Sequence, residues 1–499
     1  MLTSDRQRRA RDSVATYLRQ PDPPPNPAPP GRGADLPPGP RLPPLACCLY
    51  TAMGFWYRRV AFFEQCRARY GTPFTLWTRL PPVPLVWFDD PEHIKAIFQA
   101  PAEVLDGVNG SLEMEHFFGR TAISYKEGEE HLARKKVINR STHGEELKRI
   151  NEAMQEIAAR ELAAWPRETP FHVWPFARRL ALKAVVQVCF GGVRDERIDE
   201  LLGVVERMLT FNDNLMVLLA TQEMPPAVVR ALALYAPFRR FLTLRARADQ
   251  LVYDLIADGR RSGEARGMLG VLLAEQLPAV EIRDELMSNF LAGSATTTSG
   301  ISWGIEQLAR HPAVRERIVA EIAAGEDDAY LTATVNELLR RNTPLANSMP
   351  RTVMQPFELD GRVYPPGTRL VVANYLLHHN PAVYPDPYAF RPERFLDDPP
   401  GVFTWTPFGG GRRRCLGKTI GENEVKYVLR ELLSRYEPHV EDGRAGAVAH
   451  LAVLKPVRRV RLAPSADPAG RATARHARAP PATCPAARPT DPPAPIDAA

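Results

Sequence analysis

The sequence predicts a mainly α-helical chain with small β-sheets, an α+β fold in which helices dominate. Residues 145–280 follow a mostly amphipathic helical pattern, and Glu281–His311 forms one long helical pattern. Short β-rich runs are confined to a few places, such as Thr72–Thr78 and Pro84–Phe88, which a proline-bearing turn separates. With 499 residues, 44% of them hydrophobic, the chain can bury one large core or two to three domains.

Composition and charge exclude several classes of function. The formal net charge of +6 indicates a docking face for an acidic partner rather than nucleic-acid binding, because no long Lys/Arg run alternates with aromatic residues. Six cysteines without a CxxC spacing fit a reducing compartment, so we expect a cytoplasmic protein. No apolar run reaches the roughly 18 residues of a membrane span. Met1–Gln20 lacks the apolar core of a secretory signal, which leaves an organellar transit peptide as the alternative.

Both ends of the chain have the composition of tails. Residues 1–44 are predicted to form a proline-rich, disordered N-terminal tail, because Pro21–Pro30 is nearly all proline and a Pro-Pro-Gly-Pro hinge follows at 37–40. Residues 464–499 are rich in Ala, Pro and Arg and lack periodicity, which predicts a disordered C-terminal tail. Residues 45–463 are therefore the predicted folded domain.

The first half of this domain opens with a helix, a hairpin and a second helix. Asp90-Pro91 is expected to begin the second helix. A further helix begins at Gly128, and within it His131 and Lys135 lie one turn apart and point to the same side. They form either a cation pair aimed inward or part of a solvated basic face.

The middle of the long helical pattern Glu281–His311 reads Ala-Gly-Ser-Ala-Thr-Thr-Thr from Ala292. Gly293 weakens the helix locally, and the Thr296 hydroxyl can bond the carbonyl of Ala292 one turn back and bend the helix. The alternative is a seam of small residues at which two helices pack closely.

Downstream, Glu337 and Arg340 share a helical face, which by itself indicates only a surface salt bridge. Met354–Tyr364 is predicted to be a hairpin with Asp360-Gly361 at its turn. His378 and His379 follow a β-rich segment, and adjacent histidines on a strand face opposite ways, so we expect no joint metal ligation.

The segment with the strongest chemical signal is Phe408–Gly417, of sequence FGGGRRRCLG. Its glycines permit positive φ and close approach of a ligand to the backbone. Cys415 lies at or just before the N-terminus of a helix predicted over Lys418–Tyr436, where the helix dipole and Arg412–Arg414 favour a thiolate. Such a sulfur suits metal ligation, whereas the alternative is a glycine-rich turn with an inert cysteine.

The pattern Phe-x-x-Gly-x-Arg-x-Cys-x-Gly resembles the proximal loop of the cytochrome P-450 superfamily, the heme-thiolate monooxygenases. The resemblance covers roughly residues 35–462, with the proline hinge, distal helix, Glu-x-x-Arg, Pro-Glu-Arg-Phe and cysteine loop in family order. It implies a single large domain that encloses heme b, iron protoporphyrin IX, with the Cys415 thiolate as the axial ligand of the iron.

The resemblance also implies roles for other residues. Phe408 packs near the sulfur, and Gly409 and Gly417 belong to the heme-binding loop. The expected propionate contacts are Arg413, His131, Lys135 and Arg351. Glu337, Arg340 and Arg394 would form a buried structural network that braces the loop. The catalytic distal motif corresponds to Ala292, Gly293 and Thr296. The substrate pocket is expected from the loop with Phe117 and Phe118 and from a roof over 205–245.

The implied reaction inserts one oxygen atom of O2 into an apolar organic substrate, by hydroxylation or epoxidation, as in secondary metabolism. Electrons would come from NAD(P)H through a separate ferredoxin or flavodoxin and its reductase, since no flavin domain is fused. We expect a monomer without a membrane span. Ala295 stands where the family has an acid that relays protons. The alternatives are therefore a peroxide-using or isomerising heme-thiolate enzyme, or a non-enzymatic heme-binding module.

Overall fold

The computed structural model describes residues 27–465 apart from 32–33, 79–81, 109–118, 211–235, 442, 444–445 and 451–452. The predictions for Phe117 and Phe118, for most of the roof over 205–245, and for the tails before residue 27 and beyond residue 465 lie outside the described residues.

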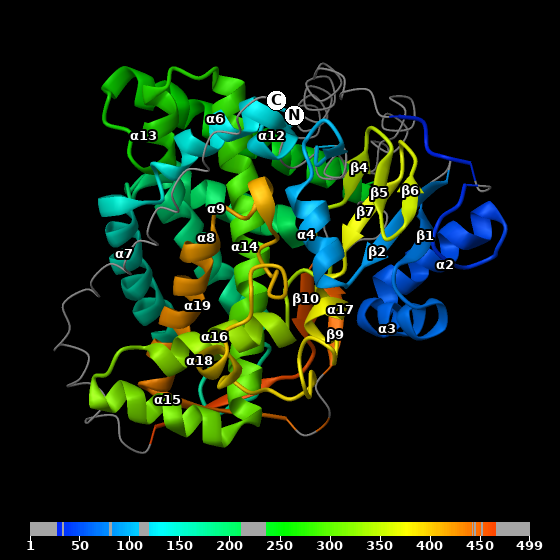
Figure 1. The fold of residues 1–499 in the computed structure, drawn as a ribbon. Coiled ribbons are helices and arrows are strands. Elements are labelled where there is room, and N and C mark those ends of the chain that lie inside the picture. The colour runs from blue at the N-terminus through cyan, green and yellow to red at the C-terminus, as the bar shows by residue number, and fades with distance from the viewer. Residues whose placement is uncertain are drawn as a thin grey trace, which may run out of the picture.

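Helices dominate the described chain, as predicted, and the strands form small sheets (Figure 1). The helices are α2 Pro44–Tyr57, α3 Arg59–Tyr70, α4 Pro91–Gln99, α6 Gly128–Asn139, α7 Gly144–Ala163, α8 Val173–Phe190, α9 Glu196–Thr210, α12 Ala236–Ser262, α13 Gly267–Ala274, α14 Ala279–Arg310, α15 Pro312–Ala324, α16 Ala329–Arg341, α17 Asn374–His378, α18 Arg394–Asp397 and α19 Lys418–Leu433, with 3-10 turns η2 Ile123–Tyr125 and η4 Gly411–Arg413. The strands are β1 Phe74–Thr78, β2 Val83–Phe88, β3 Leu105–Asp106, β4 Arg351–Val353, β5 Phe357–Leu359, β6 Arg362–Tyr364, β7 Arg369–Val372, β8 Tyr436–Val440, β9 Ala447–His450, β10 Val453–Pro456 and β11 Val460–Pro464.

The largest sheet joins segments far apart in the sequence, in the order β1-β2-β7-β4-β3. Strand β2 pairs antiparallel with β1 and parallel with β7, so residues near 85 lie beside residues near 369. The predicted hairpin at Met354–Tyr364 is present as β5 and β6, with Asp360 and Gly361 between them. Because β4 follows α16 and begins at Arg351, the sheet carries that arginine toward the cysteine loop.

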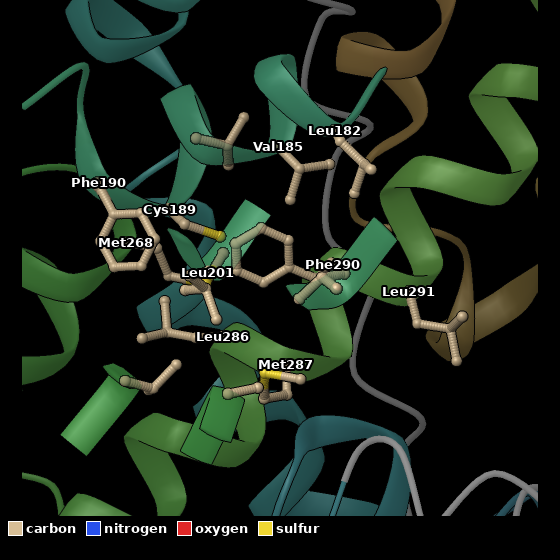
Figure 2. Close-up of a cluster of buried hydrophobic side chains, with 14 of the residues drawn as sticks. Leu182, Val185, Cys189, Phe190, Leu201, Met268, Leu286, Met287, Phe290 and Leu291 are labelled. Carbon is tan, nitrogen blue, oxygen red and sulfur yellow. The ribbon is translucent and has the colours of Figure 1, made fainter. Parts of the chain in front are cut away.

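The core is built around α14, which runs through the centre of the molecule and packs most extensively on α8 (Figure 1). Figure 2 shows one buried cluster in which Leu182, Val185 and Cys189 of α8 meet Phe290 of α14 and Leu201 of α9. Each fully buried side chain of this size contributes ~1.5–3 kcal/mol relative to an exposed one. The buried residues of α14 include the charged Arg283, Asp284 and Glu285, so the helix is buried along most of its length without being apolar all round.

Local signals determined several helix ends. Asp90 accepts hydrogen bonds from the backbone N–H groups of Glu92 and His93, and Pro91 is the first residue of α4, as predicted. The predicted helix after Cys415 is α19, which ends at Leu433 instead of Tyr436. Tyr436 begins β8, whose pairing with β11 ends the helical run.

The prediction for the two adjacent histidines was wrong in its secondary structure. The strand ends at Val372 and the chain turns into the short helix α17, of which His378 is the last residue. His378 Nε2 accepts the backbone N–H of Thr406 at 3.0 Å, and Asn374 bonds the Thr406 hydroxyl. These buried contacts with a distant segment favour a helical turn over a longer strand.

Part of the predicted N-terminal tail lies against the domain. The Pro38 carbonyl accepts the backbone N–H of Thr75 at 2.8 Å, and Asp35 pairs with Arg362 at 2.9 Å. Helix α2 begins at Pro44. Among the described residues, no helix combines the length and apolar character needed to cross a lipid bilayer.

Candidate functional site

The middle of α14 supplies the first part of the site. The Thr296 hydroxyl donates to the Ala292 carbonyl at 2.8 Å, as the sequence predicted. Ser294 and Thr298 make the same bond one turn back, to Phe290 and Ser294. The helix nevertheless continues without interruption from Ala279 to Arg310. These bonds therefore occupy the hydroxyls without breaking the helix.

The glycines of α14 also serve the alternative role, a packing seam. A Cβ on Gly293 would lie 2.8 Å from Val185 of α8, and a Cβ on Gly300 would lie 3.0 Å from Val425 of α19. Ala292 is exposed although Leu291 beside it is buried. The segment thus packs tightly on one side and remains accessible at Ala292.

The second part of the site is the cysteine loop between Phe408 and α19. Gly409 and Gly411 have φ of 66° and 65°, in the left-handed region where glycine is favoured. The Cys415 N–H donates to the Phe408 carbonyl at 3.0 Å, which closes the loop. Leu416, the next residue, packs against the buried cluster that contains Leu291 of α14. The loop and the middle of α14 therefore border the same core.

Close contacts with α4 explain two of the loop's glycines. A Cβ on Gly410 would lie 2.4 Å from the Phe98 ring, and one on Gly411 would lie 2.1 Å from the Phe98 carbonyl. Gly417 has φ −83°, so it is not used for a positive φ. The Phe408 ring packs edge-on against Trp405, with ring centroids 6.0 Å apart, and Lys418 Nζ lies 5.7 Å from the Phe408 centroid.

The expectation that its surroundings favour a Cys415 thiolate was wrong for the protein alone. The side chain is accessible, yet enough protein surrounds it for burial to raise the pKa of the Cys415 thiol. The Gly417 N–H, Lys135 and Arg414 lower that pKa without offsetting the burial. Arg413, by contrast, bonds Glu127. A metal bound to a thiol deprotonates it outright.

Two elements bring cationic side chains together beside the loop. Arg351 begins β4, Arg413 lies in η4, and both approach Gly107, the residue after β3. A Cβ on Gly107 would lie 2.0 Å from Arg351 Nη1 and 2.4 Å from Arg413 Nε. Burial and the neighbouring Arg413 lower the pKa of Arg351 to about 10. This crowding of positive charge favours an anionic ligand.

Sequence reasoning missed the acid in this cluster. Glu127, the residue before α6, accepts from Arg413 Nε at 3.1 Å and from the Gly107 N–H at 2.8 Å. Burial acts to raise the pKa of Glu127, but Arg413 and the Gly107 N–H outweigh burial, so the pKa lies below its usual value. Asp106 lies beside it, and burial together with Glu127 raises the pKa of Asp106. The only signal in the sequence was an acid immediately before the predicted helix.

His131 and Lys135 do not form the pair of cations that the sequence suggested. His131 is buried, and burial and Arg413 lower its pKa to about 4, so its imidazole is neutral near pH 7. Lys135 Nζ donates to the Arg412 carbonyl at 2.8 Å and the Arg414 carbonyl at 3.4 Å. Helix α6 thereby holds the loop through Lys135 and presents His131 as a neutral hydrogen-bonding group.

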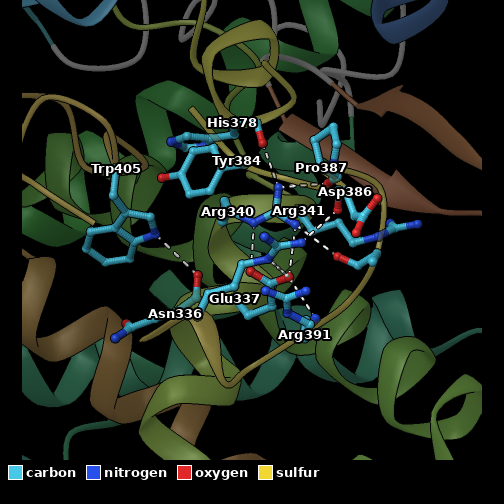
Figure 3. A network of polar contacts seen from close by, with 12 residues as sticks. Asn336, Glu337, Arg340, Arg341, His378, Tyr384, Asp386, Pro387, Arg391 and Trp405 are labelled. Carbon is cyan, nitrogen blue, oxygen red and sulfur yellow. Dashed lines mark hydrogen bonds and ion pairs between the residues drawn. The ribbon is translucent and has the colours of Figure 1, made fainter. Parts of the chain in front are cut away.

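Figure 3 shows Glu337 and Arg340 of the predicted Glu337–Arg340–Arg394 network, with Arg391 beside them. Glu337 and Arg340 are fully buried, and two parallel hydrogen bonds of 2.7 and 2.9 Å join them. Arg394 Nε lies 3.5 Å from Glu337 Oε1, an ion pair without hydrogen-bond geometry, and the Arg391 N–H donates to the same oxygen at 2.8 Å. The structure thus brings all three predicted residues together.

The same network reaches the cysteine loop. Arg340 Nη1 donates to the His378 carbonyl at 2.6 Å, and the His378 ring accepts the Thr406 N–H. The Thr406 carbonyl in turn accepts the N–H of Gly409 in the loop at 3.0 Å. Trp405 also donates to the Asn336 carbonyl of α16 at 3.2 Å. A continuous series of bonds therefore connects the buried ion pair to the loop that carries Cys415.

These residues fit a heme. The cysteine sulfur matches an iron ligand. The two glycines with positive φ leave room for a flat macrocycle, and the neighbouring donors with excess positive charge match its carboxylates. Cys415 would hold the iron, while Arg351, Arg413 and His131 would donate hydrogen bonds to the propionates. In the structure Arg413 pairs with Glu127, so that assignment remains a prediction.

Comparison with known proteins agrees with this chemistry. The family model for cytochrome P450 matches residues 37–458. Cytochrome P450 137 of Mycobacterium tuberculosis is 34% identical over 392 residues, which cover 74% of this chain and 79% of the relative. Cytochrome P450 135B1 of Mycobacterium bovis is 30% identical over 470 residues, covering 91% and 96%.

Two solved structures share the fold at low sequence identity. The retinoic acid-bound cyanobacterial CYP120A1 superposes with a TM-score of 0.70 at 22% identity, covering 83% of this chain and 96% of that one. The cytochrome P450DA heme domain gives a TM-score of 0.74 at 20% identity, covering 87% and 98%. Since the family model spans most of the sequence and the two mycobacterial relatives cover 74% and 91% of it, the chain belongs to the cytochrome P450 family of heme-binding monooxygenases.

Proposed function

We propose that Cys415 binds the iron of heme b and that the enzyme inserts one oxygen atom of O2 into an apolar organic substrate. The observation that carries this proposal is the convergence of Cys415, Arg413 and Arg351 around one glycine-rich loop braced by a buried ion pair. Heme, when bound through a thiolate, supplies the activation of dioxygen. The chain's own residues hold the heme, orient the substrate and exclude water.

The test is spectroscopic. The purified protein is reduced and exposed to carbon monoxide, and we expect the red-shifted Soret band of a sulfur-ligated heme. Cys415→Ala should abolish that band, whereas Cys189→Ala, which replaces a fully buried core cysteine, should retain it. A Cys415→Ala protein with an unchanged band would refute the assignment of the iron ligand.

We assign Thr296 to the distal side. Its hydroxyl is held in one position because it donates a hydrogen bond to the Ala292 carbonyl at 2.8 Å. Its oxygen can still accept a hydrogen bond from a water or from the substrate. Thr296 therefore positions a proton donor next to the accessible surface at Ala292. Thr296→Val keeps the volume and removes the hydroxyl, and we expect it to raise the fraction of reductant consumed without product formation.

Electrons would come from NAD(P)H through a ferredoxin or flavodoxin and its reductase. Arg412 and Arg414 are exposed on the cysteine loop, so an acidic partner can approach them. Lys418 contributes less, because it pairs with Glu422 at 2.7 Å. Arg414→Glu should slow electron transfer and weaken its dependence on salt.

The matched control for this charge reversal is Arg149→Glu. Arg149 is 72% exposed on α7 and belongs to a surface pair with Glu146. Equal electron-transfer rates for Arg414→Glu and Arg149→Glu would exclude a docking role for the loop.

A second candidate function is oxygenation with peroxide, or isomerisation of an oxygenated lipid, and Ala295 favours it. Alanine cannot relay protons, and Ala295 replaces the acid of the family motif. Turnover with a reduced partner and O2, compared with turnover on peroxide alone, separates the two. Ala295→Glu should improve the coupling of reductant to product if dioxygen is used, and unchanged coupling would argue against a deficit in proton delivery.

The substrate class remains broad within apolar metabolites: fatty acids, terpenoids, steroids, and polyketide or peptide products. We propose that the enzyme works in the cytoplasm as a monomer, without nucleic acid. A screen of these classes for substrate-induced changes in the heme spin state identifies the substrate. Sedimentation velocity of the holoenzyme tests the monomer.

A further inference from the structure

Helix α2 carries a stripe of exposed apolar side chains. Leu42 just before the helix is 37% exposed, and Leu45, Leu49 and Met53 are each 56% exposed. Their spacing of three or four residues places them on one face. On the other side Gly54 packs so closely on α3 that a Cβ would lie 2.3 Å from the Phe62 ring. The stripe therefore faces outward.

The charges around this stripe have one sign. Between Leu36 and Phe63 the sequence contains no acid and three arginines. Arg59 is buried, and its guanidinium lies 4.1 Å from the Phe55 ring centroid. Arg41 and Arg58 are exposed, one at each end of α2. The face thus combines apolar side chains in its middle with a cation at either end.

These features decide which kind of partner fits. In a symmetric contact with a second copy, Arg41 and Arg58 of both chains would meet around α2. The acids that flank this stretch, Asp35 and Glu64, already bond Arg362 and Tyr375. A lipid surface satisfies both parts, because acyl chains accept the leucines and methionine while headgroup phosphates pair with the arginines. A helix of 14 residues is about 21 Å long, which suits lying in the interface rather than spanning it.

We propose that α2 docks the enzyme on an anionic bilayer, with Leu45, Leu49 and Met53 inserted among the headgroups and Arg41 and Arg58 on phosphates. Helix α2 lies at the outer edge of the molecule beside α3 and β1, so a flat surface can reach it (Figure 1). The attachment is peripheral and reversible.

The test uses the full-length holoenzyme and lipid vesicles. Cosedimentation is measured with vesicles of phosphatidylcholine alone and with vesicles containing phosphatidylglycerol. Leu49→Glu/Met53→Glu should weaken binding to the anionic vesicles by about tenfold or more, because burial of the two side chains is lost. Arg41→Glu/Arg58→Glu should weaken binding to anionic vesicles and leave binding to neutral ones unchanged.

The matched control is Leu396→Glu/Val402→Glu. These residues are 40% and 60% exposed, and the double variant adds the same charge away from α2. It should bind like the wild type. The heme spectrum confirms that each variant is folded, and hydrogen exchange of the wild type with and without vesicles needs no variant: the amides of α2 should become protected only with anionic lipid.

Three results would overturn the proposal. These are no binding of the wild type to anionic vesicles, equal binding by the α2 and control variants, or a dimer in sedimentation velocity without lipid that Leu49→Glu/Met53→Glu dissolves. The last result would identify the face as a contact between copies.

Discussion

Replacing Glu337 by glutamine tests the buried network with the smallest change of shape. Glu337 is fully buried and receives two hydrogen bonds from Arg340, at 2.7 and 2.9 Å. A glutamine has one accepting oxygen, so one Arg340 donor then faces an NH2 group. Arg340 and Arg394 also lose their shared counter-ion. Both effects act on groups that water cannot reach.

The expected cost follows from this burial. Removing one partner of a buried ion pair destabilises a protein by ~3–5 kcal/mol, which is a large part of a typical folding free energy of ~5–15 kcal/mol. Glu200 provides the control, since Arg247 bonds it at 2.7 and 2.6 Å but its side chain is 44% exposed. Breaking such a surface pair costs at most ~1 kcal/mol.

The assay is urea unfolding of the holoenzyme, followed by far-UV circular dichroism and by the Soret band. Glu337→Gln should lower the free energy of unfolding by ~3–5 kcal/mol and Glu200→Gln by less than ~1 kcal/mol. Because hydrogen bonds connect Arg340 through His378 and Thr406 to the cysteine loop, the Soret transition should shift at least as far as the circular dichroism. A Glu337→Gln protein as stable as Glu200→Gln would falsify this reasoning.

Three further predictions concern single contacts. Gly107→Ala places a Cβ 2.4 Å from Arg413 Nε, so we expect roughly tenfold weaker heme retention, equivalent to one charged hydrogen bond of ~1.5 kcal/mol, measured by heme transfer to an acceptor protein. Burial lowers the pKa of His379 to about 3 from 6.5. Unfolded chains therefore bind a proton between these values that folded chains exclude, so His379 alone should contribute a loss of ~3 kcal/mol of stability as pH drops from 6.5 to about 4. His379→Gln should remove that part of the pH dependence in urea titrations. Gly119→Ala, at φ 80° and against the Asp284 carboxylate, should cost ~2 kcal/mol or more in the same assay.

Each of these changes has a matched control. Gly203→Ala lies in α9, where an added Cβ meets no atom within 4 Å, so it should leave heme retention unchanged and raise stability by up to ~1 kcal/mol, because alanine is favoured over glycine inside a helix. His143 is exposed, so His143→Gln should leave the pH dependence as it is in the wild type. Heme retention of Gly107→Ala equal to that of Gly203→Ala would contradict the proposed role of the arginine cluster.

Local chemistry made much of the fold predictable from the sequence. The Asp90 cap, the turn at Asp360-Gly361 and the bond from Thr296 to the Ala292 carbonyl each depend on residues within four positions of one another. The Glu337 network was predicted from the resemblance to the cytochrome P-450 superfamily, because Glu337 and Arg340 by themselves indicated only a surface salt bridge.

Features that depend on distant segments could not be predicted. Glu127 holds Arg413 only because η4 and the start of α6 meet beside β3. His378 became helical because Thr406 needs its ring nitrogen. The direction of the Cys415 pKa shift was predicted wrongly, because the sequence shows the charges near the sulfur but not its burial, which is a property of the folded chain.

The bond between Pro38 and Thr75 has a consequence for how this protein stays separate from other chains. Strand β1 is at one edge of the five-stranded sheet, and such edges recruit strands from other molecules. In the proline-rich segment, the Pro38 carbonyl accepts the Thr75 N–H, which is a donor of that edge, and Gly39 lies close to the Thr75 carbonyl. Prolines cannot themselves extend a ladder. Shortening the chain past residue 40 would therefore uncover an aggregation-prone strand, whereas stopping before residue 34 would leave it covered.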